Sequence, residues 1–296
     1  MSQKQYKPHY EHLKNKWLDE QKELQKNLVE RHKEAFLWLE HRTKQLMVGS
    51  AGSLLMLVTP VTTAFAAQQV PPKQISPTPQ TTLDPQVRLI IDLSYSLPEN
   101  VQLLTDGQEK VVSKTLTRYF GIPVSPLLQG KRLDRTYGLI GAEQHLMRYP
   151  GDTMATHFSP NDDAEKYYSS GMAPGRGAWG YFANSQQEMT EKDIMREKYY
   201  IAVQTFLASG YNEHTKEYSD FFKYRKMLVV NPENGKALVA DIADAGPSPW
   251  TGKHLGGSPE VMSYLERQDG AARGPVLYFF VDDPDDTVAL GPITIQ

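Results

Sequence analysis

The segment 46–67, LMVGSAGSLLMLVTPVTTAFAA, carries no charged side chain over 22 positions. An uncharged run of this length is enough to span the hydrocarbon core of a bilayer. Arg42 and Lys44 lie just before it, and a basic flank of this kind stays on the cytoplasmic side. The segment therefore predicts a membrane contact through residues 46–67, a cytoplasmic N-terminus and export of residues 68–296 to the cell envelope.

The end of this segment leaves two alternatives open. Ala64-Phe65-Ala66 has small residues at the two positions that a signal peptidase requires, so the chain can be a secreted protein cleaved after Ala66. Equally, the segment can be an uncleaved transmembrane signal anchor. A buried core helix fits less well, because Pro60 interrupts the run and a linker follows it directly.

The two segments beside this run are polar. Residues 1–45 hold ten Lys and Arg against seven Asp and Glu, and their apolar residues recur at roughly helical spacing, which predicts a charged amphipathic helix in the cytoplasm. Residues 68–86 contain five prolines together with Gln, Ser and Thr. That composition is typical of an extended spacer between a membrane and a folded domain.

Composition and motifs exclude several classes of function. The chain has no cysteine, so disulfides, thiolate metal sites and a cysteine nucleophile are ruled out. The net charge of -3 gives no basic field for nucleic acid. The Gly-rich stretch 169–182 lacks the Lys-Ser/Thr pair and the strand and helix of a phosphate-binding loop, so no nucleotide is expected. No Gly-x-Ser-x-Gly motif indicates a serine hydrolase.

Residues 87–296 predict a mainly β domain with a few short helices. Residues 87–97 have the length of a strand or a short helix, and residues 105–121 predict a helix capped by Thr105 or Asp106, so residues 87–130 form a helical lead-in. Asn234-Gly235 predicts a hairpin turn. Apolar runs predict strands at 198–207, 226–232, 236–244 and 275–283, and a Ser258-capped helix is expected at 258–266.

The order of these elements over residues 228–265 resembles a known pattern. A strand, an Asn-Gly turn, a strand ending in Asp-Ala-Gly-Pro, a loop with Gly-Lys and a Ser-capped helix follow one another in LVVNPENGKALVADIADAGPSPWTGKHLGGSPEVMSYL. This order resembles the double-psi β-barrel of the rare lipoprotein A family and its expansin-like relatives. The resemblance implies a six-stranded double-psi β-barrel over residues 131–296.

The resemblance implies a catalytic acid at Asp244, in the Asp-x-Gly-Pro position. The residues beside it support this role, because a carboxyl group at the end of an apolar strand and next to Trp250 is partly desolvated, which raises its pKa. The alternative is that Asp244 only caps the Gly-Pro turn. The sequence departs from the family at Gly256-Gly257-Ser258, which replaces Asp-Leu-Ser, and at residues 203–205, where no histidine stands. His157 is therefore the expected catalytic partner, with His214 as a further candidate.

The predicted substrate-binding residues surround this acid. Trp250, Lys253 and His254 would line the cleft, and Trp179 and Tyr181 would stack on sugar rings from the Gly-rich loop, although rings packed beneath a loop fit the pattern equally well. Arg148 would belong to a sugar-binding loop or to a polar turn. The stretch 143–163 contains histidines and aspartates that could bind a divalent metal. No paired histidine spacing supports that reading, so no metal and no cofactor are predicted.

Two functions follow from these observations. The first is an envelope protein that acts on peptidoglycan or another wall polysaccharide through a lytic transglycosylase-like reaction, with Asp244 as general acid. Such a reaction needs only one acid/base group, because the sugar's own hydroxyl attacks the anomeric carbon, whereas classical hydrolysis uses two carboxylates. The alternative is a non-catalytic module that binds glycan or has a structural role at the surface.

Overall fold

The computed structural model of the protein describes residues 83–158, 164–267 and 274–296. The predicted amphipathic helix, the predicted membrane segment and nearly all of the Pro-rich linker lie outside these residues. Within the described ranges, none of the helices combines the length and the apolar character that crossing a membrane requires.

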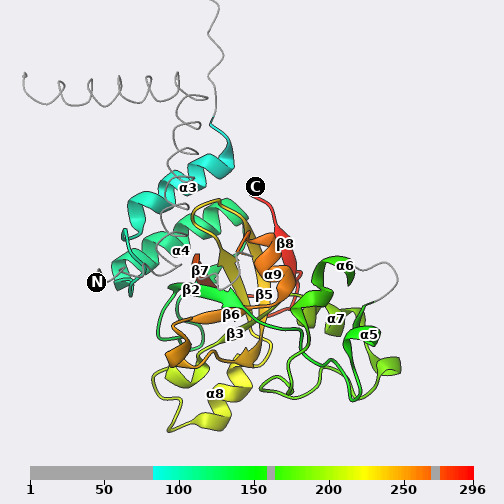
Figure 1. Ribbon diagram of the computed structural model, residues 1–296. Coiled ribbons are helices and arrows are strands. Elements are labelled where there is room, and N and C mark those ends of the chain that lie inside the picture. The colour runs from blue at the N-terminus through cyan, green and yellow to red at the C-terminus, as the bar shows by residue number, and fades with distance from the viewer. Residues whose placement is uncertain (1–82, 159–163, 268–273) are drawn as a thin grey trace, which may run out of the picture. The chain divides into compact units, whose positions relative to one another are not determined.

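Six strands close into a mixed β-barrel (Figure 1). Around the barrel the order is β7-β2-β6-β3-β5-β4, and β4 pairs with β7 to close the ring. The β2–β6 and β3–β5 pairs are parallel, and the other four pairs are antiparallel. The barrel strands are β2 (Tyr137–Ala142), β3 (Tyr200–Val203), β4 (Lys226–Val230), β5 (Ala237–Ala245), β6 (Leu255–Gly257) and β7 (Gly274–Val281); β1 (Val124–Ser125) and β8 (Gly291–Ile293) add to β7 and β5.

Both faces of β4, β5 and β7 are buried, which explains their nearly continuous apolar sequence. Alternate residues point into the barrel, where they meet side chains from all six strands. The residues between them face outwards and pack against α3 (Pro85–Ser96) and α4 (Asp106–Phe120). Along β4, for example, Val229 belongs to the interior cluster and Leu228 to the outer one.

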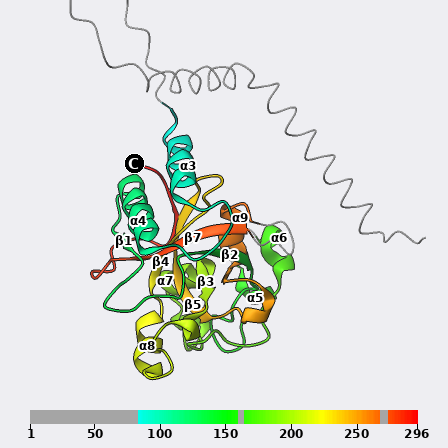
Figure 2. The same ribbon diagram turned by 90° about the vertical axis from the view of Figure 1, so that its left-hand side faces the viewer.

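The two N-terminal helices lie side by side on the outer face of the barrel (Figure 2). The helix α4 begins with a capping box, in which Thr105 and Gln108 satisfy each other's backbone N–H groups, and it ends at Gly121 in the left-handed conformation. The helix predicted at 105–121 is thereby confirmed. The segment 87–97 is helical and not a strand, because Asp84 caps it and Pro85 occupies its first turn.

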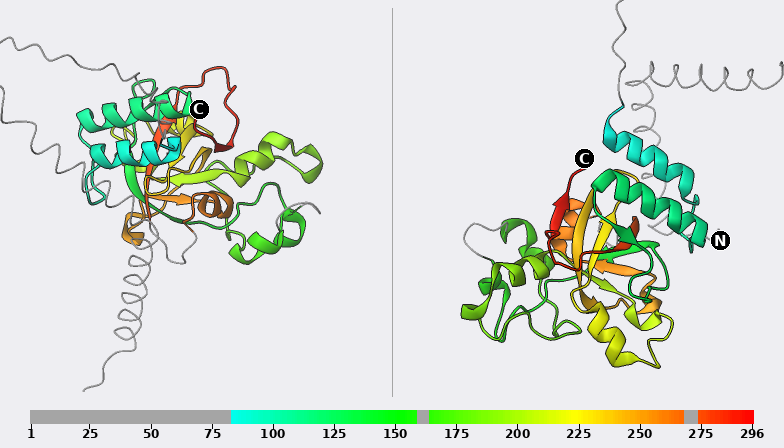
Figure 3. Two further views of the ribbon diagram at one scale, coloured as in Figure 1. Left: turned by 90° about the horizontal axis from the view of Figure 1, so that it is seen from above. Right: turned by 180° about the vertical axis from the view of Figure 1, so that it is seen from behind.

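The remaining helices are short. Figure 3 shows that α5 to α7 lie on the side of the barrel opposite α3 and α4. On α8, Phe221 and Phe222 are buried in the interior cluster. These helices are α5 (Met154–His157), α6 (Ala164–Tyr167), α7 (Glu191–Lys198), α8 (Thr215–Phe222) and α9 (Pro259–Tyr264), and 3₁₀ turns occur at Tyr168–Ser170, Gln186–Glu188, Thr205–Leu207 and Pro249–Thr251.

The structure changes several of the expected elements. The strand predicted at 198–207 is shorter, because α7 ends at Lys198 and a 3₁₀ turn begins at Thr205. The hairpin between β4 and β5 is present, but only Gly235 of the Asn-Gly pair has a positive φ, at 72°. The strand β6 was not predicted, because two of its three residues are glycines. A Cβ at Gly256 would lie 2.2 Å from Cγ of Glu143, so the Glu143 side chain occupies the space that a larger residue would need there.

Candidate functional site

A buried group of charged side chains surrounds Glu197, next to the barrel. Glu197 is the penultimate residue of α7, which begins with a capping box between Thr190 and Asp193 and leads directly into β3. Only 2% of Glu197 is exposed. A carboxylate this deeply buried requires charged or hydrogen-bonding partners, because an unpaired charge in the interior is strongly destabilising.

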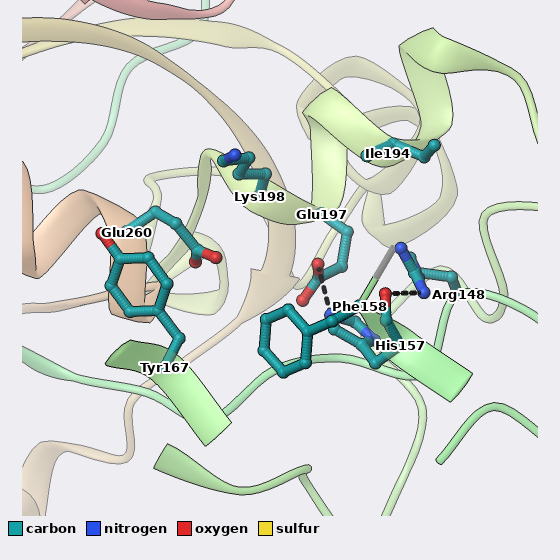
Figure 4. A pocket seen from close by; sticks show the side chains of 8 residues that line it. All are labelled: Arg148, His157, Phe158, Tyr167, Ile194, Glu197, Lys198 and Glu260. Carbon is teal, nitrogen blue, oxygen red and sulfur yellow. Dashed lines mark hydrogen bonds and ion pairs between the residues drawn. The ribbon is translucent and has the colours of Figure 1, made fainter. Parts of the chain in front are cut away.

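Two histidines and one backbone amide contact the Glu197 carboxylate. Oε1 accepts a hydrogen bond from the Leu146 N–H at 3.0 Å and lies 3.3 Å from His145 Nδ1. Oε2 lies 3.0 Å from His157 Nε2, a contact that Figure 4 shows. The rings of His145 and His157 are themselves neighbours, with centroids 4.7 Å apart. Both oxygens of Glu197 are therefore directed at imidazole nitrogens.

Asp152 and Arg148 hold His157 from its other side. Asp152 Oδ2 lies 3.0 Å from His157 Nδ1, and it also accepts hydrogen bonds from the backbone N–H and Nε of Arg148 at 3.0 and 3.1 Å. The Arg148 guanidinium also donates to the backbone carbonyl of His157. These contacts fix the His157 ring between two carboxylates.

The protonation of this group follows from its hydrogen bonds. Burial alone would raise the pKa of Asp152 and of Glu197, but hydrogen bonds from the facing histidines, and from Arg148 to Asp152, lower both pKa values to about 2. Burial alone would lower the pKa of His157, but its bonds to Asp152 and Glu197 raise it to about 9. Arg148, Asp152, His157 and Glu197 thus form a buried network of balanced charge.

Glu260, in the first turn of α9, is another buried acid beside this network. It is 7% exposed, and its Oε2 accepts no hydrogen bond from the described residues. Burial raises its pKa to about 7. In Figure 4 its carboxylate points toward the space that the Glu197 carboxylate faces. The free volume is about 20 Å³, enough for a water molecule or an ion, and its lining is Arg148, His157, Phe158, Tyr167, Ile194, Glu197, Lys198 and Glu260.

Asp244, the predicted general acid, lies at the end of β5 opposite Ala202 of β3. Its side chain is half-buried, and its Oδ1 accepts hydrogen bonds of 2.8 Å from the N–H groups of Ala178 and Ala245. Its Oδ2 receives no hydrogen bond from the described part of the chain. Burial raises the pKa of Asp244, and the two amide hydrogen bonds offset part of that effect.

A lysine and a second carboxylate lie near Asp244. Lys253 Nζ is 2.7 Å from Glu143 Oε1 and donates to the Ala142 carbonyl at 3.0 Å. The charge of Glu143 adds to the increase in the pKa of Asp244. Gln204 follows β3 where the resemblance places a histidine, and its side chain donates to the Pro247 carbonyl at 2.9 Å.

The other predicted binding residues differ in exposure and in the elements they contact. Trp250 is 87% exposed in the 3₁₀ turn Pro249–Thr251. His254 Nδ1 accepts the N–H of Leu139, so this nitrogen supports the barrel, and burial lowers the pKa of His254. In the Gly-rich loop, Trp179 packs against the interior cluster and donates to the Ser219 carbonyl at 3.2 Å, whereas the Tyr181 ring contacts Arg176, with 5.5 Å between guanidinium and ring centroid.

The predicted residues therefore divide between two places. Arg148 and His157 belong to the buried network, whereas Asp244 lies at the end of β5 and Lys253 lies just before β6, paired with Glu143. The Tyr200 side chain feels the charges of both places. Burial raises its pKa, and carboxylates from both places raise it further: Glu197 and Glu260 in the buried group, and Glu143 and Asp244 in the other. Its hydroxyl donates to the Gln144 carbonyl.

Sequence reasoning missed the two acids of the buried group. Glu197 and Glu260 stand 40 and 103 positions after His157, and each lies in a short helix with no local sign that its glutamate is buried. The only available indication was the density of His, Arg and Asp in residues 143–163. The sequence matches no family model, and no curated protein matches it either.

Proposed function

We propose that this protein is a cell-envelope protein whose barrel is a double-psi β-barrel similar to that of the rare lipoprotein A family. The proposal places residues 68–296 outside the cytoplasm, either anchored through residues 46–67 or released by cleavage after Ala66. The closed mixed barrel is compatible with this fold. The proposed substrate is peptidoglycan or another wall polysaccharide, and the proposed reaction is lytic transglycosylase-like cleavage.

The observation that carries the proposal is the hydrogen bonding and burial of the Asp244 side chain. One of its oxygens is held by two backbone amides, while the other receives no hydrogen bond from the described residues. Burial raises the pKa of this half-buried carboxyl group, so a larger fraction carries a proton near neutral pH than for an ordinary aspartate. A carboxyl group that is held in place and has a raised pKa is better suited than an ordinary aspartate to donate a proton to a glycosidic oxygen.

The reaction needs only this one acid. Asp244 gives its proton to the glycosidic oxygen as the bond from that oxygen to the anomeric carbon breaks. A hydroxyl of the same sugar then attacks the anomeric carbon and returns its proton to the Asp244 carboxylate, so no water is consumed and the acid is regenerated. The ion pair between Lys253 and Glu143 supplies charged groups near this acid, and the exposed Trp250 ring offers a face on which a sugar can stack.

A second candidate, a non-catalytic glycan-binding module, is favoured by a different observation. No histidine or carboxylate of the described residues hydrogen-bonds Asp244, and Gln204 stands where the resemblance places a histidine. The two amide hydrogen bonds of Oδ1 are also those of an aspartate that only shapes a turn. On this alternative the same face binds glycan without cleaving it.

The test is incubation of the purified full-length protein, in a mild detergent, with peptidoglycan sacculi. Soluble products are identified by mass spectrometry, and the expected products carry anhydro-sugar ends. Asp244→Asn should abolish release while keeping the fold, because the asparagine oxygen can still accept both amide hydrogen bonds. Asp220→Asn, an exposed change on α8, is the matched control and should release products like the wild type.

The outcomes separate the two candidates. Sedimentation of the protein with sacculi without any release would contradict the enzyme and support the binding module. Release that persists in Asp244→Asn would contradict the role of this acid. If the protein neither bound to nor cleaved any wall polysaccharide, both candidates would be contradicted.

A further inference from the structure

The buried network contains a ready set of metal ligands. His145, His157 and Glu197 each offer one ligand atom, and these atoms all lie within 4.8 Å of one another. The three residues come from a loop, from α5 and from α7, so only the tertiary fold brings them together. All three are less than 5% exposed.

We propose that His145, His157 and Glu197 bind a divalent transition-metal ion of the zinc class, and that the Glu260 carboxylate faces the remaining coordination position. This site is separate from the Asp244 face, and it does not depend on the proposed action on glycan.

The distances within the group suit such an ion. In a tetrahedral zinc site with bonds of about 2.0–2.1 Å, neighbouring ligand atoms are about 3.3 Å apart. The His145 nitrogen lies 3.3 Å from Oε1 of Glu197 and the His157 nitrogen lies 3.0 Å from Oε2, and one ligand atom from each of the three residues lies within 4.8 Å of the other two, so a small inward movement of the side chains would complete the site. Two imidazoles and one carboxylate also form a ligand set that zinc, cobalt and nickel accept, whereas magnesium and calcium prefer oxygen ligands alone.

The neighbouring residues hold the ligands as residues around metal sites ordinarily do. Asp152 lies 3.0 Å from His157 Nδ1, which leaves Nε2 as the nitrogen directed at the proposed ion. A carboxylate behind a ligating histidine fixes its tautomer and orientation. The Leu146 N–H fixes Glu197, and Arg148 fixes Asp152.

An independent observation points to a missing ligand. Glu260 is 93% buried, and its Oε2 has no hydrogen-bond partner among the described residues. The carboxylate lines the same cavity as His157 and Glu197 and points into it (Figure 4). Buried polar atoms without a partner are uncommon in native proteins and call for a specific explanation. Glu260 is not one of the three residues whose ligand atoms lie within 4.8 Å of one another, so a water molecule bound to the metal ion is the group that would satisfy this oxygen.

The experiment is titration of the purified full-length protein, stripped with a chelator, with Co²⁺ and Zn²⁺. Co²⁺ should give visible absorption bands of low-symmetry four- or five-coordination at one equivalent per chain, and Zn²⁺ should displace it. Mg²⁺ should do neither. Asp152→Asn should weaken Zn²⁺ binding about 10- to 100-fold, and His145→Gln should weaken it further. Asp244→Asn, which leaves the network intact, should bind like the wild type.

Thermal unfolding of the wild type supplies a second test that requires no variant to fold. A ligand that binds only the folded state raises the unfolding midpoint as its concentration increases, so Zn²⁺ should raise the midpoint and Mg²⁺ should not. A folded wild type with neither a Co²⁺ spectrum nor a Zn²⁺-dependent midpoint would overturn the proposal. Unchanged Zn²⁺ affinity in folded His145→Gln would overturn it as well.

Discussion

Replacing Asp241 with asparagine tests how this fold tolerates a buried charge. Asp241 lies in the middle of β5 and is 1% exposed. Its Oδ2 accepts a hydrogen bond from Arg196 Nε at 3.2 Å, whereas its Oδ1 has no partner among the described residues. The burial of this carboxylate opposes its ionisation, while the ion pair with Arg196 favours it, and the balance decides how stability depends on pH.

The structure gives the size of this balance. Burial raises the pKa of Asp241 from 3.8 to about 7, and the charges of Arg196 and Lys226 offset only part of the increase. Because the folded state holds this proton more tightly, the stability that protonated Asp241 contributes is fully present below pH 3.8. It is lost as the pH rises through 7. A difference of about 3 pH units, at 1.36 kcal/mol per unit, corresponds to a loss of about 4 kcal/mol.

Asparagine removes this titration with little change of shape. Its side-chain oxygen can still accept the Arg196 hydrogen bond. Arg196 is not left buried and unpaired, because its side chain is 23% exposed and its guanidinium lies 4.2 Å from the ring centroid of Tyr224. We therefore expect the unfolding free energy of Asp241→Asn, measured relative to the wild type, to rise by about 4 kcal/mol between pH 4 and pH 8.

The assay is urea unfolding of full-length protein followed by tryptophan fluorescence at several pH values from 4 to 8.5. Taking the difference between variant and wild type cancels the titration of all other groups. Asp220→Asn, with a side chain that is 66% exposed, is the control and should show no comparable trend. A difference that stays flat, or that falls with pH, would refute the reasoning and show that the pair with Arg196 outweighs the burial of Asp241.

Two further perturbations test the packing of the barrel. Phe222→Ala should cost about 3–5 kcal/mol in urea unfolding, because Phe222 is fully buried in the interior cluster; Val111→Ala, at a position that is 50% exposed on α4, should change stability by less than about 0.5 kcal/mol. Gly177→Ala should lower the free energy of unfolding by about 1–3 kcal/mol, and with it the thermal midpoint, because the added Cβ would lie 2.8 Å from the Ala243 carbonyl oxygen. Gly175→Ala, with no atom within 4 Å of its Cβ, is the matched control, and equal midpoints would contradict the close approach of the loop to β5.

Local sequence patterns predicted the elements whose cause is local. The helix at 105–121 was predictable because its capping residues and its Gly121 end lie within one stretch, and the hairpin around Gly235 because a turn needs only its own residues. The strands β4, β5 and β7 were visible as apolar runs. The helices α7 and α8 were not predicted, because each has only eight residues, too few for a clear apolar repeat, although α7 does begin with a capping box.

The candidate sites divide in the same way. Asp244 could be proposed from the sequence because the resemblance that implies its role rests on one short stretch, a strand end followed by a Gly-Pro turn. His145, Asp152 and His157 stood out in the sequence as part of a stretch rich in polar residues. The buried group they belong to could not be predicted, because Glu197 comes from α7 and Glu260 from α9.

The absence of cysteine chemistry, the uncharged segment at 46–67 and the strand-turn-strand pattern of the folded domain are visible in the amino-acid sequence, because each depends on residue types and short spacings. The closure of the strands into a ring and the burial of both faces of β4, β5 and β7 appear only in the folded structure. The fold also brings Glu197 against two histidines and buries Glu260 with its Oε2 lacking a hydrogen-bond partner among the described residues. Burial and the meeting of distant side chains set the charge state of these groups, and both arise only when the chain has folded.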